Sequence, residues 1–404
     1  MVLSKIKNPS HVGAFGSFGI YVYDKYKALV AQVDVEESAS FYKTAAGSIF
    51  GVSIGPQNPA VDVQSMLTLE FYPLHRLPKA AKLKIEISGQ LKIECPGANG
   101  KDLDFEHNAK LLRKPLKVSC SSPNSGNNKS GLSIFDIDGP FKADYYHDDP
   151  VAAAAGVVDP SKLIKIVFMQ SRNPLSAMDI RGLKISTLTA AGKLVDVYDA
   201  GATVLFTVVP SPFYKAAVVA EQTETSTASA FTFTFTLANT VLAGGTIELV
   251  APPELQLPTS QAAVTIKPIK NMDTVHTKAS AAVDPAGKVL IVIRDFISQA
   301  TARLSAADEI SFELRDLVTP KTTVSSRSFK VYTKDKADHL INYIESDLFV
   351  TMFKGKAIST LVLTSSSAVV GALASHTFSF QTPIPLTSSD QLLIVYPAET
   401  YPPL

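Results

Sequence analysis

The sequence has almost no imbalance of charge, since its 404 residues include 38 Lys and Arg against 37 Asp and Glu. Proteins that hold nucleic acid or an anionic membrane by electrostatic attraction carry a basic excess. The balance therefore argues against both as partners. The densest basic stretch, KLLRKPLK at 110–117, fits an exposed strand that its lysines protect from pairing with other strands.

Long apolar runs are also missing. A helix that crosses a bilayer needs about 20 consecutive apolar residues, and the longest candidate, VAAAAGVV at 151–158, is much shorter. The first residues lack the basic start and the apolar core of about 7–15 residues that mark a secretory signal. The chain is therefore either cytosolic or given without its native N-terminus, and the repeats described below favour the second interpretation.

Motifs for catalysis or cofactor binding are absent as well. The seven histidines are scattered, and no two have the close spacing of a zinc site. No serine lies in the glycine-flanked elbow of a hydrolase, and no glycine-rich phosphate loop precedes a helix. We therefore expect no catalytic residues and no cofactor.

A two-residue alternation is what the sequence contains in abundance. Residues 231–249 read FTFTFTLANTVLAGGTIEL, so Phe233 and Phe235 share one face of a strand and the threonines the other. Ile247 and Leu249 continue the apolar face after a Gly-Gly turn. Nearly every periodic segment alternates in this way, and sustained helical periodicity is missing. This pattern predicts an all-β chain of antiparallel, immunoglobulin-like β-sandwich domains.

The alternating stretch occurs three times. A shift of 145 residues forward, and one of 164 backward, superimposes the pattern without a gap. Each copy therefore supplies the same two core positions, which are Leu69 and Phe71, Phe233 and Phe235, and Phe378 and Phe380. Such self-similarity at a fixed spacing indicates internal repeats.

A second motif, a proline turn followed by a spacer and a strand, alternates with the first. It reads KNPSHVGAFGSFGI at 7–20, RNPLSAMDIRGLKI at 172–185 and VTPKTTVSSRSFKV at 318–331. The order predicts complete sandwiches at 51–214, with an insertion, and at 215–358. Residues 1–50 then form the C-terminal half of a preceding repeat, and 359–404 the N-terminal part of a further one. Tandem sandwiches of this kind are expected to form an elongated rod.

The two half repeats raise the question of what completes them, because a half sandwich exposes its core face and unpaired strand edges. We expect the natural polypeptide to continue beyond both ends of this sequence. A rival hypothesis is completion in trans by strands of a neighbouring copy. It ranks lower because the two halves together still lack the middle of a domain.

The combination of NP, a spacer and SFGIYVYD at 8–24, followed by FTFTFTLANTVLAGGTIELVAP at 231–252, resembles a repeat of very large surface proteins of protists. In those proteins immunoglobulin-like sandwiches are strung along extracellular chains. The resemblance covers the full length and implies a structural or adhesive role outside the cell, as in a surface filament or flagellar hair. It carries no catalytic residues across. The third copy departs from the pattern, with Thr319-Pro320 in place of Asn-Pro.

Three residue sets are candidate sites. Cys95 and Cys120, the only cysteines, both fall in the insertion of the first complete repeat, which predicts a disulfide unless they are two unrelated buried thiols. Asn128 begins NKS, the one acceptor triplet for N-glycosylation with a permitted middle residue, within a polar stretch. Asp136 and Asp138 in DIDG are a weak calcium candidate, although a solvated turn fits them better.

Two functional hypotheses follow. The first is a non-enzymatic structural component of an extracellular filament or surface appendage, whose partners are other copies or other filament subunits. The alternative is a surface adhesin or glycan-binding protein that uses the loops of one repeat. A third hypothesis, an enzyme with accessory sandwiches, requires a non-repeated catalytic domain, and these residues contain none.

Overall fold

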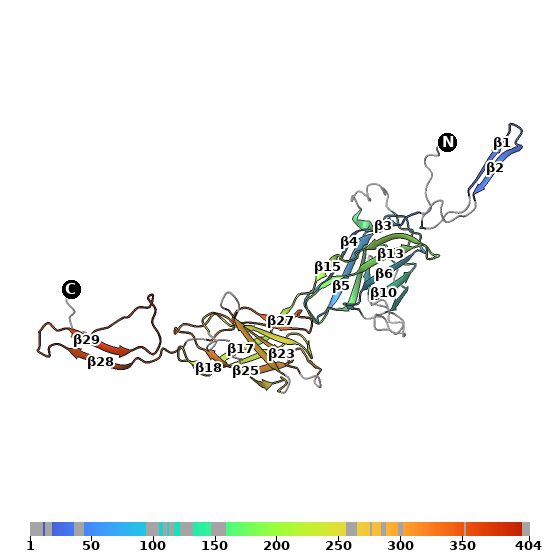
Figure 1. Cartoon of the computed structure of the whole chain (residues 1–404). Helices are drawn as coiled ribbons and strands as arrows, with labels where there is room; N and C mark the ends of the chain where they lie inside the picture. The colour runs from blue at the N-terminus through green and yellow to red at the C-terminus, as the bar shows by residue number, and fades with distance from the viewer. Residues whose placement is uncertain are drawn as a thin grey trace. The chain divides into compact units, whose positions relative to one another are not determined.

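A computed structural model describes residues 11–12, 18–35, 44–93, 105–107, 111–112, 117–121, 132–146, 159–255, 265–274, 277–283, 288–297, 302–350 and 353–397. Within these ranges the chain consists of strands joined by turns, and one 3-10 turn at Pro160–Lys162 is the single helical element (Figure 1). None of the described segments forms a helix with the length and apolarity needed to cross a membrane. The predicted all-β fold is confirmed.

The chain divides into two compact units. The first comprises Met1–Ser211 with His339–Ile341, and the second comprises Pro212–Asp338 with Asn342–Leu404. Each unit holds two main sheets, and each also holds one terminal hairpin. The predicted repeat limits at 51–214 and 215–358 stay a prediction.

The first unit is a sandwich of a six-stranded and a five-stranded sheet. Among the described strands of these two sheets, one parallel contact, that of β14 with β3, accompanies the antiparallel pairings. The larger sheet runs, in order, through β3 (Gly47–Ser48), β14 (Leu194–Asp199), β13 (Leu183–Leu188), β6 (Lys82–Ser88), β10 (Leu132–Asp138) and β9 (Lys117–Ser121). The smaller runs through β4 (Phe50–Pro56), β5 (Gln64–Tyr72), β11 (Ile164–Arg172) and β7 (Lys92–Ile93), with β8 (Phe105–His107) also pairing with β11.

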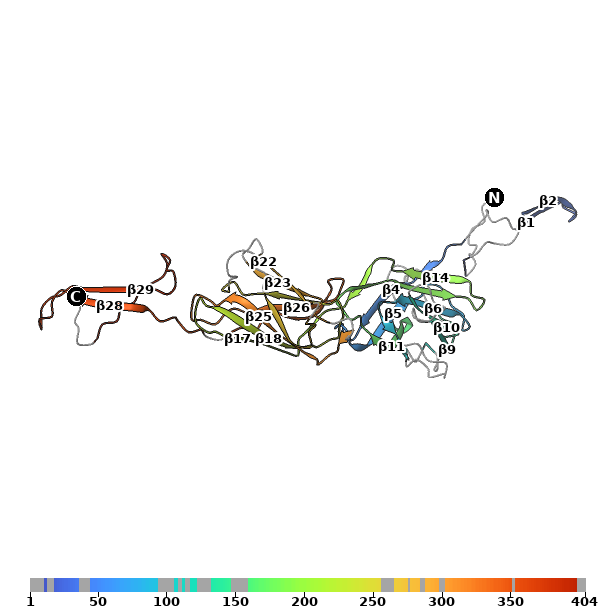
Figure 2. The same cartoon turned by 60° about the horizontal axis from the view of Figure 1, so that its bottom comes forward.

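The second unit repeats this order. Its six-stranded sheet runs through β16 (Ser211–Pro212), β27 (Leu340–Ile344), β26 (Lys330–Lys334), β20 (Thr246–Val250), β23 (Val289–Arg294) and β22 (Lys278–Val283). Its four-stranded sheet runs through β17 (Lys215–Ala220), β18 (Ala228–Thr236), β25 (Glu309–Val318) and β21 (Ile266–Lys270). Figure 2 shows β17, β18 and β25 in one layer and β22, β23 and β26 in the other.

Four short strands form two further pairs. They are β12 (Asp179–Arg181) with β15 (Val204–Thr207) in the first unit, and β19 (Val241–Leu242) with β24 (Arg303–Leu304) in the second. The terminal hairpins are β1 (Phe18–Tyr23) with β2 (Leu29–Val35), and β28 (Ser359–Ser365) with β29 (His376–Gln381). We call β1–β2 the tail hairpin, and β28–β29 together with residues 391–397 the head segment.

The alternation seen in the sequence becomes the core of each sandwich. On β18 the three phenylalanines are buried and the threonines between them are half-buried. Phe233 stacks on Phe312 of β25 with ring centroids 5.4 Å apart, and it meets Phe329 edge-on at 5.1 Å. Burying one such side chain stabilises the fold by about 1.5–3 kcal/mol. The two sheets are therefore held together by interdigitated aromatic and aliphatic faces.

The repeats also agree in strand register. Ile54 faces Leu69 across β4 and β5, and Val218 faces Phe233 across β17 and β18. The head segment continues the series, because Leu363 faces Phe378. The tail hairpin agrees in the same way with β13 and β14, so that the pair Ile20–Val33 matches the pair Ile185–Tyr198. Each of these equivalences follows the sequence shifts given above.

The proline motif has a definite structural task in each unit. The side-chain amide of Asn173, next to Pro174, donates hydrogen bonds to the carbonyl oxygens of Asn58 (2.8 Å) and Ala60 (2.7 Å), in the loop before β5. In the second unit Thr319 takes this place. Its hydroxyl donates to the carbonyl of Glu224 (2.5 Å) in the corresponding loop. The change from Asn-Pro to Thr-Pro therefore preserves the anchoring of the loop.

Candidate functional site

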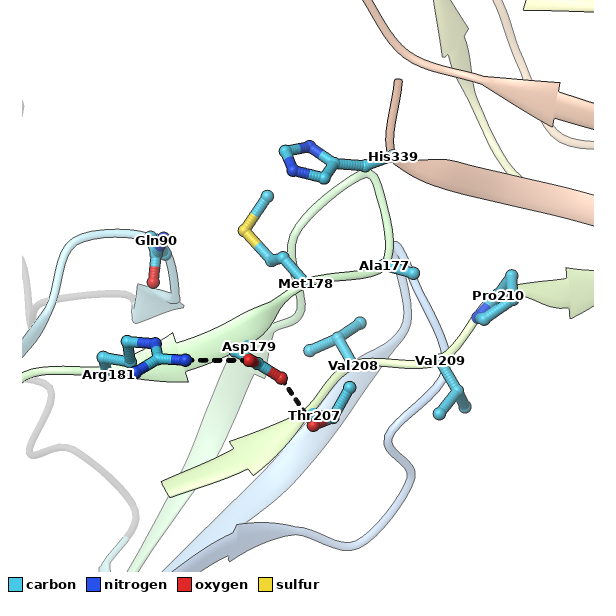
Figure 3. A pocket seen from close by; sticks show the side chains of 10 residues that line it. All are labelled: Gln90, Ala177, Met178, Asp179, Arg181, Thr207, Val208, Val209, Pro210 and His339. Carbon is cyan, nitrogen blue, oxygen red and sulfur yellow. Dashed lines mark hydrogen bonds and ion pairs between the residues drawn. The ribbon is translucent and has the colours of Figure 1, made fainter. Parts of the chain in front are cut away.

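The first unit contains an open pocket of about 580 Å³ (Figure 3). Strands β12 and β15, with the segment before β12 and the segment after β15, supply most of its wall. The lining residues are Gln90, Ala177, Met178, Asp179, Arg181, Thr207, Val208, Val209, Pro210 and His339.

The charged groups of this pocket satisfy one another. Asp179 accepts a hydrogen bond from the hydroxyl of Thr207 (2.8 Å) and forms an ion pair with Arg181 (3.0 Å), as the dashed lines of Figure 3 show. The hydrogen bond from Thr207 contributes most to lowering the pKa of the Asp179 carboxyl below its ordinary value, and the contact with Arg181 lowers this pKa further. Arg181 also donates to the carbonyl of Ala202. An acid that is already paired in this way is a poor proton acceptor and a poor anchor for a cationic ligand.

A second polar constellation lies at the edge of the larger sheet. The fully buried carboxylate of Asp196 on β14 accepts hydrogen bonds from Nδ1 of His75 (2.5 Å) and from the His75 backbone N–H (3.1 Å). The backbone N–H of Asp196 donates to the hydroxyl of Thr187 on β13 (3.0 Å). A histidine oriented by a buried aspartate is a frequent element of hydrolase sites.

The second unit has an amide pair at the two equivalent positions. Shifts of 164 and 146 residues place Asn239 at the position of His75, and Asn342 at that of Asp196. Asn342 is fully buried and accepts hydrogen bonds from the backbone and the side-chain amide of Asn239. It also donates to Thr333, the counterpart of Thr187. In that unit two amides make the corresponding contacts without any group that transfers protons, so the pair fastens the bend after one strand to a strand of the larger sheet.

The pair was missed by reasoning from the sequence. The signal was present, since Asp196 stands within the strand LVDVYD, next to the buried Val195. An acidic side chain buried in such a strand needs a hydrogen-bonding or ionic partner, because burying an unpaired carboxylate is costly. The partner lies 121 residues away, and only the fold brings it near.

The predicted disulfide and the predicted glycosylation site each involve a residue outside the described part of the chain. Cys120 is on β9, while Cys95 is not among the residues described, so the disulfide stays a prediction. Asn128 also lies outside them, and its glycosylation stays a prediction.

The calcium candidates Asp136 and Asp138 are exposed side chains on β10. They face Lys84 and Lys82 across the sheet, and Asp138 forms an ion pair with Lys82 at 3.2 Å. Across the part of the chain that the structure describes, no three His, Cys, Asp or Glu side chains come close enough to hold a metal ion. The two aspartates are therefore placed as cross-strand partners of lysines.

The six predicted core positions fall into two groups. Leu69, Phe71, Phe233 and Phe235 are buried within their sandwiches, whereas Phe378 and Phe380 on β29 are only half-buried. The ring of Phe378 meets that of Tyr396 edge-on at 6.1 Å, which places the end of the head segment near β29. The head segment and the tail hairpin thus expose apolar side chains whose counterparts in the two units are buried.

No protein-family model and no curated protein matches the chain. Solved structures with a similar trace include a C-terminal domain of the AgI/II polypeptide BspA of Streptococcus agalactiae, at 9% identity and a TM-score of 0.25 over 74% of this chain and 99% of that one. A second is the C-terminal domain of the antigen I/II-family protein AspA of Streptococcus pyogenes, at 10% and 0.22 over 82% and 99%. A third is the major pilin SpaD of Corynebacterium diphtheriae, at 11% and 0.26 over 68% and 61%. Scores this low carry no argument about this chain, and its fold rests on the strand orders and registers given above.

Proposed function

We propose that the chain is a non-enzymatic structural component of an extracellular filament or cell-surface appendage. One observation carries the proposal: the strand order of the first unit recurs in the second, and each terminal hairpin repeats the register of one strand pair of these units. A spacer gains length from each additional copy of a domain, whereas an enzyme rarely needs the same domain several times. The structural role of the His75–Asp196 pair agrees with this function.

The mechanism is mechanical. Each unit folds from its own strands and buries its own aromatic and aliphatic face, so it resists unfolding independently of the next unit. Contacts to other filament subunits, to further copies or to glycans are then made by strand edges and loops. These partners form part of the proposal, as does the position outside the cell.

Electron microscopy of source cells labelled with antibodies against the two units tests the proposal. We expect the label on regular surface fibres, at an axial spacing that is a multiple of the unit repeat. Label confined to the cytoplasm, or to dispersed soluble protein, would contradict it.

A surface adhesin is the alternative, with recognition by the insertion that runs from Cys95 past Asn128. Replacement of residues 122–131, which lie between β9 and β10 and include Asn128, by a short glycine-serine linker in the full chain separates the two functions. Loss of binding to a glycan array or to host cells, with fibre assembly intact, favours the adhesin. Unchanged binding favours the filament component.

A further inference from the structure

Strand β17 forms an open edge of the second sandwich. It stands at one end of the four-stranded sheet, and β18 is the one strand that pairs with it among those the structure describes. Its counterpart β4 takes the same place in the first unit and pairs there with β5 alone. Both strands lie inside two-sheet sandwiches in the interior of the sequence, so the open edge is a property of the domain.

The sequence of β17 lacks the features that usually keep an edge strand from pairing with another chain, such as proline, a bulge or a very short length. β4 has a register shift and ends at Pro56, and β21, the other edge of the β17 sheet, contains Pro268 and a register shift. β17 keeps an unbroken register with β18 over Lys215–Ala220, and its residues KAAVVA include neither proline nor glycine. Val219 is 63% exposed. β17 is therefore a regular, mainly apolar edge that accepts a further strand.

The hydrogen bonds to β18 determine which backbone groups of β17 point outward. The N–H of Glu221, just after the strand, donates to the carbonyl of Ala230 at 2.8 Å. In an antiparallel pair, residues at every second position bond to the same neighbour. The odd-numbered residues of β17 therefore bond to β18, as Glu221 does. The residues whose backbone groups point away from β18 are Ala216, Val218 and Ala220.

We propose that β17 of one copy of the chain pairs antiparallel with β17 of a second copy, with Val218 opposite its own equivalent. Ala216 then lies opposite Ala220 of the other copy, so that outward-pointing N–H groups meet outward-pointing carbonyl oxygens along the whole strand. The two four-stranded sheets become one continuous sheet. Because the same surface is used on both sides, the contact is isologous and closes as a two-fold dimer.

The side chains of the outer face favour a second copy as the occupant. Lys215 and Glu221 are both exposed and stand at equal distances in sequence on either side of Val218. Pairing about Val218 therefore places Lys215 opposite Glu221 of the other copy, and the two-fold symmetry forms this ion pair at both ends of the contact. Between them Ala217 lies opposite Val219, which covers the exposed valine. A slip of one residue would mispair the backbone groups, and a slip of two would separate both ion pairs.

The contact is small, because one short strand of each copy forms most of it. Interfaces well below the standard size are weak and reversible. We expect a dissociation constant on the order of 100 µM for the isolated pair of chains. The inference rests on the proposed function in one respect, that copies meet through strand edges, and it identifies the edge by which two chains associate side by side.

Sedimentation velocity of the 404-residue chain, from about 10 to 300 µM, tests the contact. The wild-type chain should show a monomer–dimer equilibrium. Lys215→Glu and Glu221→Lys each replace two attractive pairs by two repulsive ones, so each should weaken dimerisation at least about fivefold. The double variant Lys215→Glu/Glu221→Lys restores both pairs with reversed polarity and should dimerise within about twofold of the wild type. Lys330→Glu, the same charge change at an exposed position of the other sheet, is the matched control and should leave dimerisation unchanged.

Mixing the two single variants gives the decisive measurement. A Lys215→Glu chain carries two acidic ends and a Glu221→Lys chain two basic ends, so each stays largely monomeric alone while the mixture should form one-to-one dimers. Val218→Pro removes an outward-pointing N–H without touching the bonds to β18, and it should abolish dimers at every concentration. Circular dichroism checks that each variant stays folded.

Three results would overturn the inference. They are a wild-type chain that stays monomeric up to about 300 µM, single variants that dimerise as the wild type does, and a mixture of the two that forms no dimer. The outcome is separable from that of the filament proposal. Dimers in solution without labelled fibres on cells contradict the proposed function alone, and labelled fibres together with a monomeric chain contradict the β17 pairing alone.

Discussion

Asp196 and Asn342 hold the same position in the two units and bind the same neighbours. Each accepts a backbone N–H, from His75 at 3.1 Å and from Asn239 at 2.9 Å. Each also donates its own backbone N–H to a threonine hydroxyl on the adjacent strand, at 3.0 and 3.1 Å. The bend after β5 is therefore bound to β14 by an acidic side chain, and the equivalent bend after β18 is bound to β27 by an amide.

Removing either side chain should destabilise only its own unit. Asp196→Ala removes the acceptor of the His75 backbone N–H and imidazole and leaves a cavity at a fully buried position, which costs about 2–4 kcal/mol in the first unit. Asn342→Ala should have a similar effect in the second. Hydrogen exchange followed by mass spectrometry in increasing urea reports the stability of each unit separately. The double variant His75→Asn/Asp196→Asn installs the amide pair and should stay within about 1 kcal/mol of the wild type. Loss of stability in both units from one substitution would contradict independent folding.

The stability cost of replacing Gly47 should depend on the side chains that face it, those of His75 and Asp196. A Cβ atom at Gly47 would collide with the imidazole of His75 and with the carboxylate of Asp196. The equivalent position, 164 residues further along the chain, is Ser211, and Asn239 takes the place of His75. We expect Gly47→Ser alone to displace the imidazole and to destabilise the first unit by about 1–3 kcal/mol. In a His75→Asn/Asp196→Asn background, which installs the side chains of the equivalent positions 239 and 342, the same change should cost less, and denaturant melts of the four chains of this cycle measure the coupling. Equal costs in both backgrounds would show that Gly47 is not linked to the pair.

A charge in the aromatic core should unfold one unit and spare the other. Phe235→Asp buries a carboxylate among Phe213, Phe233 and Phe312, a change that costs more than about 4 kcal/mol. Limited proteolysis should then digest the second unit and leave a resistant fragment from the first. Thr232→Lys, on the outer face of the same strand and opposite Glu313, is the control and should leave both fragments resistant. Simultaneous digestion of both units by the Phe235 variant would argue against separable units.

The disulfide can be tested by counting thiols. If Cys95 and Cys120 are bridged, the denatured chain releases no free thiol until it is reduced. Reduction should destabilise the first unit by about 3–4 kcal/mol in the chain-entropy model, and leave the second unchanged. Calorimetry of the oxidised and reduced chains measures this difference. Two reactive thiols in the unreduced, denatured chain would rule the bridge out.

Alternation and spacing were sufficient to predict the sandwiches and the equivalent strands. A strand with one buried face has period two, and a shift by one residue would turn every phenylalanine of β18 outward. The register of β5, β18 and β29 was therefore contained in the positions of Leu69, Phe233 and Phe378. The half-burial of Phe378 and Phe380 departs from their predicted role as core positions, because a core face needs a second sheet and β29 has none within the described residues.

The polar details were beyond prediction from local pattern. The pairing of His75 with Asp196 joins distant segments, so neither residue has a neighbour in sequence that signals it. The pocket around Asp179 arises where short strands end, and nothing in its lining has a period. Such features depend on loop paths, which tolerate many sequences and leave weak traces in any one of them.

The shared registers also create a hazard during synthesis, since a β5 that emerges from the ribosome could pair with β25 as readily as with β11. Backbone geometry alone does not discriminate between these partners, and mispairing between neighbouring copies is a common fault of repetitive chains. The position of the bulky residues differs between the copies: β11 carries Phe168 where β25 has Leu314, and β25 carries Phe312 where β11 has Ile166. A swapped pair would therefore place its phenylalanine one pair away from the native position, too large for one site and leaving the other underfilled. The sequence differences between the copies thus favour the pairing of each strand with partners from its own sandwich.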